Sequence, residues 1–219
     1  MTKPVLTISS KNYGAWSLRG WLMARLAGLD FVEKVIPPDD PSMKAEILLL
    51  SSSILVPSLS HSGITVWDTL AIGEYLNEIL PKAGLLPADI KARAHCRAVC
   101  GEMHSGFSSL RSALPMNIKA KFTDFKVWSR AQSDIDRIVA IWKDCLATYK
   151  GPYLFGAQPC MADAMFAPVV MRFLSYDVAL EPVCAAYCQR MVLLPAMQEW
   201  ITAAKAEPEE AGDELEAEF

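Results

Sequence analysis

A short segment of the chain places a proline, a hairpin turn and an acidic-hydroxyl pair in an order suited to holding a small peptide. Val56-Pro57 begins an apolar strand, Ser62-Gly63 can form the turn, and Asp68-Thr69 opens an apolar helical run. An X-Pro bond is the one place where a cis peptide is readily accessible, and a cis bond there would turn the N–H and C=O of Val56 outward. Those two groups could pair with a peptide ligand as an added strand does, although a proline in a tight loop could also be purely structural.

The Asp68-Thr69 pair supplies the second element of this pattern. At the start of a helix, free N–H groups and the helix dipole favour a bound carboxylate. Asp and Thr are also common N-caps, so the pair could serve the helix, a ligand or both.

Length and composition predict a globular protein with a substantial core, in one large domain or two small ones. The chain has 219 residues, of which 52% are apolar and 21% charged. No apolar run approaches the roughly 18 residues needed to cross a bilayer. The first residues lead directly into a strand, without the apolar core of a signal peptide. We therefore expect a cytoplasmic protein that does not enter a membrane.

Charge is concentrated at the C-terminal end. Residues 207–219 carry seven acidic and no basic residues, and removing them from the net charge of −4 leaves the rest of the chain near +3. We expect a solvated, disordered tail, with a partner-binding tail as the alternative. Basic residues are not interleaved with aromatic ones in any patch, which argues against a nucleic-acid partner.

The six cysteines are predicted to be core thiols. Cys96/Cys100 and Cys184/Cys188 are each spaced i, i+4, which puts each pair on one helix face. Their spacing is not that of a zinc site, the chain has three histidines, and disulfides are rare in cytosolic proteins. We therefore predict no metal.

Hydrophobic periodicity divides the chain in two. Residues 1–81 have the pattern β-α-β-α-β-β-α, with strands at 5–9, 31–36, 56–59 and 64–67 and helices at 16–26, 43–50 and 70–80. Residues 82–89 are predicted as a linker. The following helices are expected at 90–114 (ending at Pro115), 128–149, 161–174, 182–191 and 195–206. The prediction is an α/β domain over 1–81 followed by an all-α domain over 90–206.

This pattern, with Val-Pro before the third strand, resembles a thioredoxin-like domain followed by a helical bundle, and so the cytosolic glutathione S-transferase family. The Val56-Pro57 pair corresponds to the family's cis-proline loop, and the segment 67–76 to its acidic-hydroxyl helix start. Met161-Ala162-Asp163 corresponds to the x-A-D sequence that begins a helix in the family's second domain. Trp16-Ser17-Leu18-Arg19 resembles the start of the first helix in zeta-like members, so we expect a bacterial, zeta-like relative.

The resemblance implies glutathione as a co-substrate. The backbone of Val56 would hold its cysteinyl part, with Pro57 forming the cis-proline loop beside it. Thr69 would bind the carboxylate of the γ-glutamyl end, and Asp68 its ammonium. The glutathione thiolate would attack a small apolar electrophile, by conjugation or isomerisation.

Asn12 and Tyr13 stand where zeta-like members have two serines, so the resemblance makes them the candidate catalytic residues. An amide N–H₂ and a phenol can each donate to a thiol sulfur, lower its pKa and stabilise the thiolate. Ser10 and Ser17 are the alternative donors. The segment 11–14 could also be simply a turn.

Other positions depart from the family pattern. Leu55 lacks the positive charge that reaches the glycyl carboxylate of glutathione in many members, and Lys44 or His61 could replace it. Cys160 stands where a Ser or Thr would complete a capping box with Asp163, so we expect an incomplete box and a structural role for Asp163.

The family's second-substrate cleft would be lined here by Trp16, His104, Ser105 and Arg111. A two-fold homodimer is also expected. Because the usual serine and the basic residue at position 55 are missing, the alternative is a non-catalytic protein that binds glutathione or another ligand on the same fold.

Overall fold

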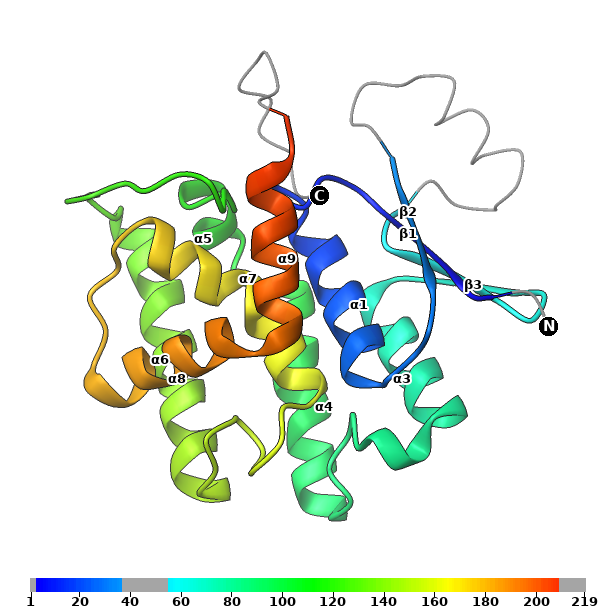
Figure 1. Cartoon of the computed structure of the whole chain (residues 1–219). Helices are drawn as coiled ribbons and strands as arrows, with labels where there is room; N and C mark the ends of the chain where they lie inside the picture. Colours follow the sequence, from blue (N-terminus) through cyan, green and yellow to red (C-terminus); the bar gives the residue numbers. More distant parts are fainter. Residues whose placement is uncertain (1–2, 37–54, 209–219) are drawn as a thin grey trace.

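The computed structural model describes residues 3–36 and 55–208, which form a small sheet beside a group of helices (Figure 1). The strands are β1 (Val5–Ile8), β2 (Val32–Val35), β3 (Ser58–His61) and β4 (Ile64–Trp67), in the order β2-β1-β3-β4. The strand β1 is parallel to β2, to which the helix α1 (Ala15–Leu26) connects it, and antiparallel to β3. Mixed pairing of this kind, with a helical crossover, is the thioredoxin-like arrangement that the sequence predicted.

The hairpin from β3 to β4 confirms the predicted turn. Both turn residues have positive φ, 51° at Ser62 and 78° at Gly63, as a two-residue hairpin loop requires. The strand β3 begins at Ser58, because the cis peptide Val56-Pro57 lies immediately before it. After β4, the helix α3 (Thr69–Ile79) packs against α1, and the short 3₁₀ helix η1 (Pro81–Ala83) follows.

The rest of the described chain is helical, which confirms the predicted fold class. Its helices are α4 (Ile90–Ser105), α5 (Ser108–Ala113), α6 (Ser129–Tyr149), α7 (Met161–Ser175), α8 (Pro182–Leu193) and α9 (Pro195–Ala206). The helix α7 is buried along almost its whole length and packs against α1, α4 and α8. Both α7 and α9 lie beside α1, which joins the sheet to the helical part (Figure 1). Within the described residues, no helix has both the length and the apolar character to span a bilayer.

The prediction of a single helix over 90–114 is wrong. The helix α4 ends at Ser105, Gly106 is extended, and Phe107 adopts a left-handed φ of 64° before α5 begins. The apolar positions continue across the break, so periodicity concealed it. The left-handed position that usually follows a helix is taken here by Phe107 and not by a glycine, which is uncommon for a bulky residue.

The prediction of an incomplete capping box is also wrong. The backbone N–H of Cys160 donates to Asp163 at 2.8 Å, and the Cys160 side chain faces the N–H of Asp163 in return. Asp163 is fully buried and also accepts from Leu154 N (3.1 Å) and Tyr187 Oη (3.0 Å). Burial raises the pKa of the Asp163 carboxyl, and these three donors act against that rise. Asp163 therefore fixes the start of α7 to the preceding loop and to α8.

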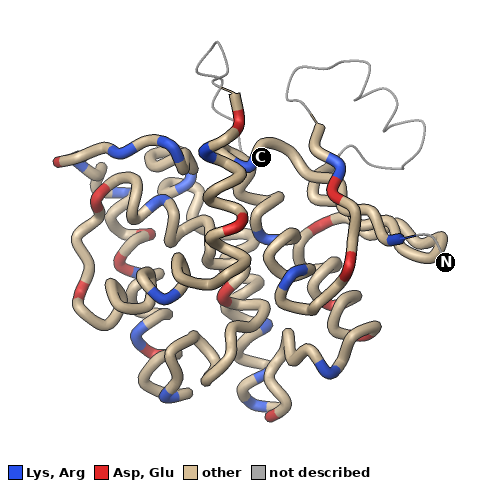
Figure 2. Tube along the Cα trace, viewed as in Figure 1, with Lys and Arg blue, Asp and Glu red and all other residues tan. Residues whose placement is uncertain are grey.

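Charges of both signs alternate over the outer helices (Figure 2). Arg137 of α6 forms two hydrogen bonds with Glu102 of α4, at 2.6 and 2.8 Å, and its guanidinium lowers the pKa of Glu102. Lys143 forms a 2.8 Å ion pair with Glu181, just before α8. The six cysteines are all buried and free, as expected for core thiols. The predicted helix over 43–50, with Lys44, lies outside the described residues.

Candidate active site

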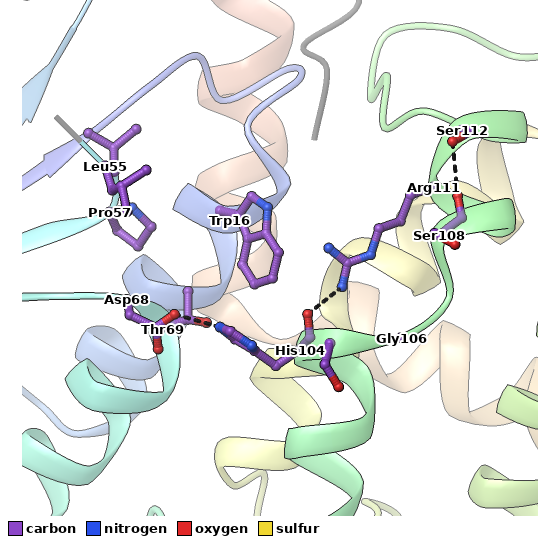
Figure 3. Close-up of a pocket in the computed structure, with 12 residues that line it drawn as sticks. Trp16, Leu55, Pro57, Asp68, Thr69, His104, Gly106, Ser108, Arg111 and Ser112 are labelled. Atoms are coloured by element: carbon purple, nitrogen blue, oxygen red, sulfur yellow. Dashed lines mark hydrogen bonds and ion pairs between the residues drawn. The ribbon is translucent and has the colours of Figure 1, made fainter. Parts of the chain in front are cut away.

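A cavity of about 500 Å³ lies between the sheet part and the helical part. Its walls come from the start of α1, the loop before β3, the start of α3 and the α4–α5 region (Figure 3). The lining residues are Trp16, Leu55, Val56, Pro57, Asp68, Thr69, His104, Ser105, Gly106, Ser108, Arg111 and Ser112. The structure thus brings together every predicted glutathione-binding residue and every predicted co-substrate residue.

The cis peptide Val56-Pro57 forms one wall of this cavity. A glycine in the middle of α1 lets the proline approach closely, since a Cβ at Gly20 would lie 2.6 Å from Pro57 Cγ. Real Cβ atoms are essentially never found so close to another heavy atom, so this position requires glycine. The helix α1 therefore supports the proline loop from behind.

Asp68 has two roles at the start of α3. Its Oδ1 caps the helix by accepting from Leu70 N at 2.8 Å and Ala71 N at 3.3 Å. Its Oδ2 accepts from His104 Nε2 at 2.5 Å, across the cavity from α4 (Figure 3). Asp68 also has φ +74°, a conformation that costs energy for a residue with a side chain and that recurs at functional sites.

Thr69 provides a hydroxyl that the described part of the protein leaves without a hydrogen-bond partner. The residue is 1% exposed, its Oγ1 is buried, and it lines the cavity at the first turn of α3. A buried hydroxyl without a partner costs free energy, so its position at a helix N-terminus is suited to a ligand that accepts a hydrogen bond.

Trp16 forms the apolar wall at the start of α1. The guanidinium group of Arg19 lies 4.2 Å from the ring centroid, and that of Arg111 lies 4.7 Å from it. The ring of His104 meets it edge-on, with centroids 5.1 Å apart. These two cation–π contacts hold the indole in place.

The helix break at Gly106 explains how Arg111 reaches the cavity. After the break, the side chain of Arg111 reaches from α5 to the end of α4, where Nη2 donates to the carbonyls of Met103 (2.6 Å) and His104 (3.1 Å). It therefore satisfies two carbonyls that the end of α4 leaves open. The same break brings Ser108 and Ser112 into the lining, two positions that sequence reasoning missed. The run of serines around Gly106 was the available signal.

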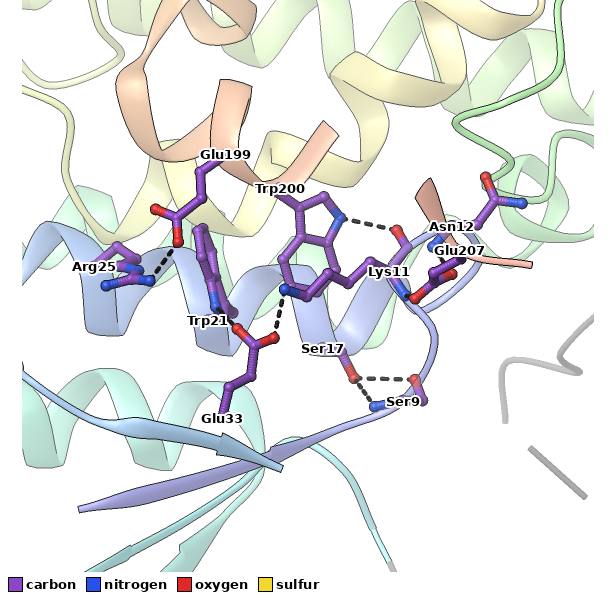
Figure 4. A network of polar contacts seen from close by, with 10 residues as sticks. All are labelled: Ser9, Lys11, Asn12, Ser17, Trp21, Arg25, Glu33, Glu199, Trp200 and Glu207. Atoms are coloured by element: carbon purple, nitrogen blue, oxygen red, sulfur yellow. Dashed lines mark hydrogen bonds and ion pairs between the residues drawn. The ribbon is translucent and has the colours of Figure 1, made fainter. Parts of the chain in front are cut away.

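Asn12 and Tyr13 lie outside the set of described residues that line the cavity. Asn12 is 2% exposed, and its Oδ1 accepts from Lys119 N at 2.9 Å, which directs the side chain toward the helical part (Figure 4). The backbone N–H of Tyr13 donates to Ser10 Oγ at 3.3 Å. The alternative donor Ser17 is fully buried and accepts from Ser9 N at 2.9 Å.

His61, considered as a substitute for a basic residue at position 55, pairs through Nδ1 with Tyr75 Oη at 2.8 Å. Elsewhere in the described residues, one trio could hold a metal ion, whereas the sequence predicted none. The ligand atoms of His95, Asp144 and Cys145 lie within 4.8 Å of one another. Burial raises the pKa of the Cys145 thiol to about 12, which keeps it protonated.

Comparison with known proteins gives the family. Residues 13–79 match the glutathione S-transferase N-terminal domain, and residues 125–203 match the glutathione S-transferase C-terminal domain. The chain belongs to the glutathione S-transferase family. It is 30% identical over 159 residues to glutathione S-transferase 1 of Dianthus caryophyllus, covering 72% of this chain and 71% of that protein.

Two further relatives are consistent with this membership. Maleylacetoacetate isomerase of Rattus norvegicus is 28% identical over 185 residues, with 82% of each protein covered. A crystal structure of a glutathione transferase homologue from Burkholderia, with bound glutathione, superposes with a TM-score of 0.71 at 24% identity. It covers 94% of this chain and 99% of that one, and it supports the glutathione S-transferase fold of the described residues.

Proposed function

We propose that this glutathione S-transferase is an active enzyme in which the glutathione thiolate attacks an electrophilic carbon, by conjugation or isomerisation. The observation that carries the proposal is that Thr69, whose buried hydroxyl has no hydrogen-bond partner among the described residues, lines the same cavity as the cis Val56-Pro57 peptide. The two elements bind different parts of a tripeptide, and one cavity contains both.

Glutathione would be held along the sheet side of the cavity. The backbone N–H and C=O of Val56 would pair with the cysteinyl residue, as in β-strand addition. Thr69 Oγ1 and the N-terminus of α3 would bind the γ-glutamyl carboxylate. Its ammonium would join His104 on Asp68, since a carboxylate has lone pairs for more than one donor.

Thiol activation is assigned to the loop that contains Asn12 and Tyr13. A donor to the sulfur lowers the thiol pKa, so that more of it is ionised at neutral pH. The amide of Asn12 could still donate through its N–H₂, but the bond from Lys119 N to Oδ1 holds this side chain toward the helical part, which makes the phenol of Tyr13 the stronger candidate. The start of α1 adds a helix dipole, and within the described residues no side chain caps it at Gly14.

The co-substrate would occupy the helical side of the cavity. Trp16 offers an apolar face, Arg111 a positive charge, and Ser105, Ser108 and Ser112 hydroxyl groups. This lining suits an electrophile with an apolar body and a carboxylate. Isomerisation of such a molecule needs the thiolate to add to a carbon–carbon double bond, rotation about the resulting single bond, and elimination of the thiolate. The relative named maleylacetoacetate isomerase favours this reaction class.

Two measurements test the proposal. Turnover of 1-chloro-2,4-dinitrobenzene forms a carbon–sulfur bond and releases chloride, and calorimetric titration gives the affinity for glutathione. We expect both binding and turnover. If Tyr13→Phe and Asn12→Ala each leave turnover intact, the assignment of thiol activation to this loop is wrong even though the family is right.

The second candidate is a glutathione-binding protein without efficient catalysis. The engagement of the Asn12 side chain with Lys119 and the presence of Leu55 at the glycyl position favour it. This candidate would be selected if glutathione binds but neither 1-chloro-2,4-dinitrobenzene nor an unsaturated dicarboxylic acid is turned over. The absence of binding would reject both.

We further propose a cytoplasmic homodimer in which residues 1–81 bind glutathione and residues 90–206 choose the co-substrate. The strand β4 ends the sheet and exposes Ile64 (49%) and Trp67 (38%), an apolar edge that a second subunit could cover. Light scattering on the purified protein should give twice the mass of the chain. Exchanging 90–206 with a relative should change the preferred electrophile and retain the glutathione affinity.

A further inference from the structure

The end of α9 is attached to the loop that connects β1 to α1. The carboxylate of Glu207, the residue that ends α9, accepts three hydrogen bonds from this loop (Figure 4). The donors are Ser10 Oγ at 2.8 Å, Lys11 N at 2.6 Å and Asn12 N at 3.0 Å. The contacts join positions almost 200 residues apart in the sequence.

The arrangement is a binding site for a carboxylate, made by consecutive backbone N–H groups and one hydroxyl. Successive N–H groups that point to one spot form a concave site for an anion, and hydrogen bonds to an ionised acceptor are the stronger kind. With the carboxylate in place, Lys11 is 8% exposed and Asn12 2% exposed, so the carboxylate takes the place of water as an acceptor for their N–H groups; that of Asn12 is shared with Ser10 Oγ at 3.1 Å.

The surrounding contacts position the carboxylate and the loop relative to each other. Trp200 of α9 donates from Nε1 to the carbonyl of Lys11 at 2.9 Å. Lys119 Nζ donates to the backbone carbonyl of Glu207, while its backbone N–H binds the Asn12 side chain. Lys11 Nζ forms a 2.5 Å ion pair with Glu33 on β2. The loop is thus held from α9, from the segment around 119 and from the sheet.

We propose that Glu207 is a positioning residue that holds the 10–13 loop in the geometry needed for thiol activation. The inference rests on the proposed function, in which Asn12 and Tyr13 act on the thiol. Glutathione itself is bound through Val56, Asp68 and Thr69, which lie on other elements. Loss of Glu207 should therefore slow the reaction of bound glutathione and leave its binding nearly unchanged.

The test compares Glu207→Ala and Glu207→Gln with Glu199→Gln, another acidic residue of α9. Glu199 pairs with Arg25 and is half exposed, so its variant controls for charge and for the stability of α9. We expect kcat with 1-chloro-2,4-dinitrobenzene to fall about 10-fold in both Glu207 variants, because small displacements of a catalytic group have large effects on rate. The KM for glutathione should change less than about twofold, and Glu199→Gln should behave as the wild type.

Acetate gives a readout that a general loss of stability would not produce. Acetate should partly restore kcat in Glu207→Ala, because it can occupy the three donors, and should leave the wild type unchanged. The proposal is overturned if both Glu207 variants retain the wild-type kcat, or if kcat falls in Glu207→Ala without recovery in acetate.

Amide hydrogen exchange separates this inference from the proposed function. The N–H groups of Lys11 and Asn12 should exchange faster in Glu207→Ala than in the wild type, without glutathione present. If the wild type shows no turnover, the proposed function fails, and the exchange data still show whether Glu207 holds the loop. If the wild type turns over and Glu207→Ala matches Glu199→Gln, the positioning role fails and the function stands.

Discussion

Replacing Thr69 by valine should have opposite effects on the free protein and on glutathione binding. Valine has nearly the same shape as threonine but lacks the hydroxyl. In the free protein, the Oγ1 of Thr69 is buried without a partner in the described residues, so its removal should cost nothing and could add about 1 kcal/mol to the unfolding free energy. In the complex, the hydroxyl would donate to the γ-glutamyl carboxylate, a charged acceptor.

The expected loss of affinity follows from that charge. A hydrogen bond to a charged group contributes about 1.5–3 kcal/mol, which corresponds to a dissociation constant roughly 10- to 150-fold higher. Calorimetric titration with glutathione measures the affinity, and urea unfolding of the free protein measures the stability. Thr65→Val is the matched control, since Thr65 is exposed on β4 and lies outside the cavity lining, and it should leave the affinity unchanged.

The result that would refute the reasoning is specific. If Thr69→Val destabilises the free protein by more than about 1 kcal/mol and leaves glutathione affinity unchanged, the hydroxyl serves the fold and not the ligand. Loss of both stability and affinity would mean that the valine disturbs the start of α3. Thr69→Ser keeps the hydroxyl without the extra methyl group, so it should then recover the affinity if the hydroxyl binds the ligand.

Three further changes test the supporting structure. Gly20→Ala should lower the unfolding free energy by about 1–3 kcal/mol and weaken glutathione binding, because the added Cβ meets the ring of Pro57. Gly101 has open space around it, so Gly101→Ala is the control and should be neutral or stabilising in urea unfolding. Arg137→Met should lower the unfolding free energy by about 0.5 kcal/mol at neutral pH. Because Arg137 lowers the pKa of Glu102, this contribution is present above the unfolded pKa of about 4.3 and should disappear as the pH falls through the folded pKa. A cost that persists in acid would contradict the ion pair. Asp163→Ala leaves three buried donors unpaired and should cost about 3–5 kcal/mol; a loss below about 1 kcal/mol would contradict its capping role.

Local sequence signals were sufficient where a feature depends on neighbouring residues. The hairpin at Ser62-Gly63 and the cap at Asp68 follow from the backbone preferences of two or three consecutive residues. The cis bond at Val56-Pro57 was implied by the family resemblance, since an isolated X-Pro bond prefers trans. Periodicity likewise gave most helices to within a few residues, because the helices have a buried and an exposed side.

Features that depend on distant contacts were not predictable in the same way. The orientation of Asn12 is set by Lys119, more than 100 residues away, and a sequence position alone does not show which way a side chain turns. The pairing of His104 with Asp68 likewise requires α4 to lie across the cavity from α3. The prediction that the disordered tail begins at residue 207 is wrong for Glu207, whose carboxylate binds the 10–12 loop; residues 209–219 lie outside the described part. The acidic composition gave the charge of Glu207 and not its partner.

The break at Gly106 connects the fold to the chemistry of the helical wall of the cavity, where the co-substrate is proposed to bind. If α4 continued through residue 114, as the apolar pattern suggests, Arg111 would lie two turns beyond His104 and could not donate to the carbonyls of Met103 and His104. The break between α4 and α5 allows those contacts and puts the guanidinium against Trp16, while Ser108 and Ser112 reach the lining. The chemistry of the helical wall therefore depends on one short interruption. If the proposed function is right, changes in its length should alter the preferred electrophile and leave the proposed glutathione contacts at Val56, Asp68 and Thr69, on the opposite wall, unchanged.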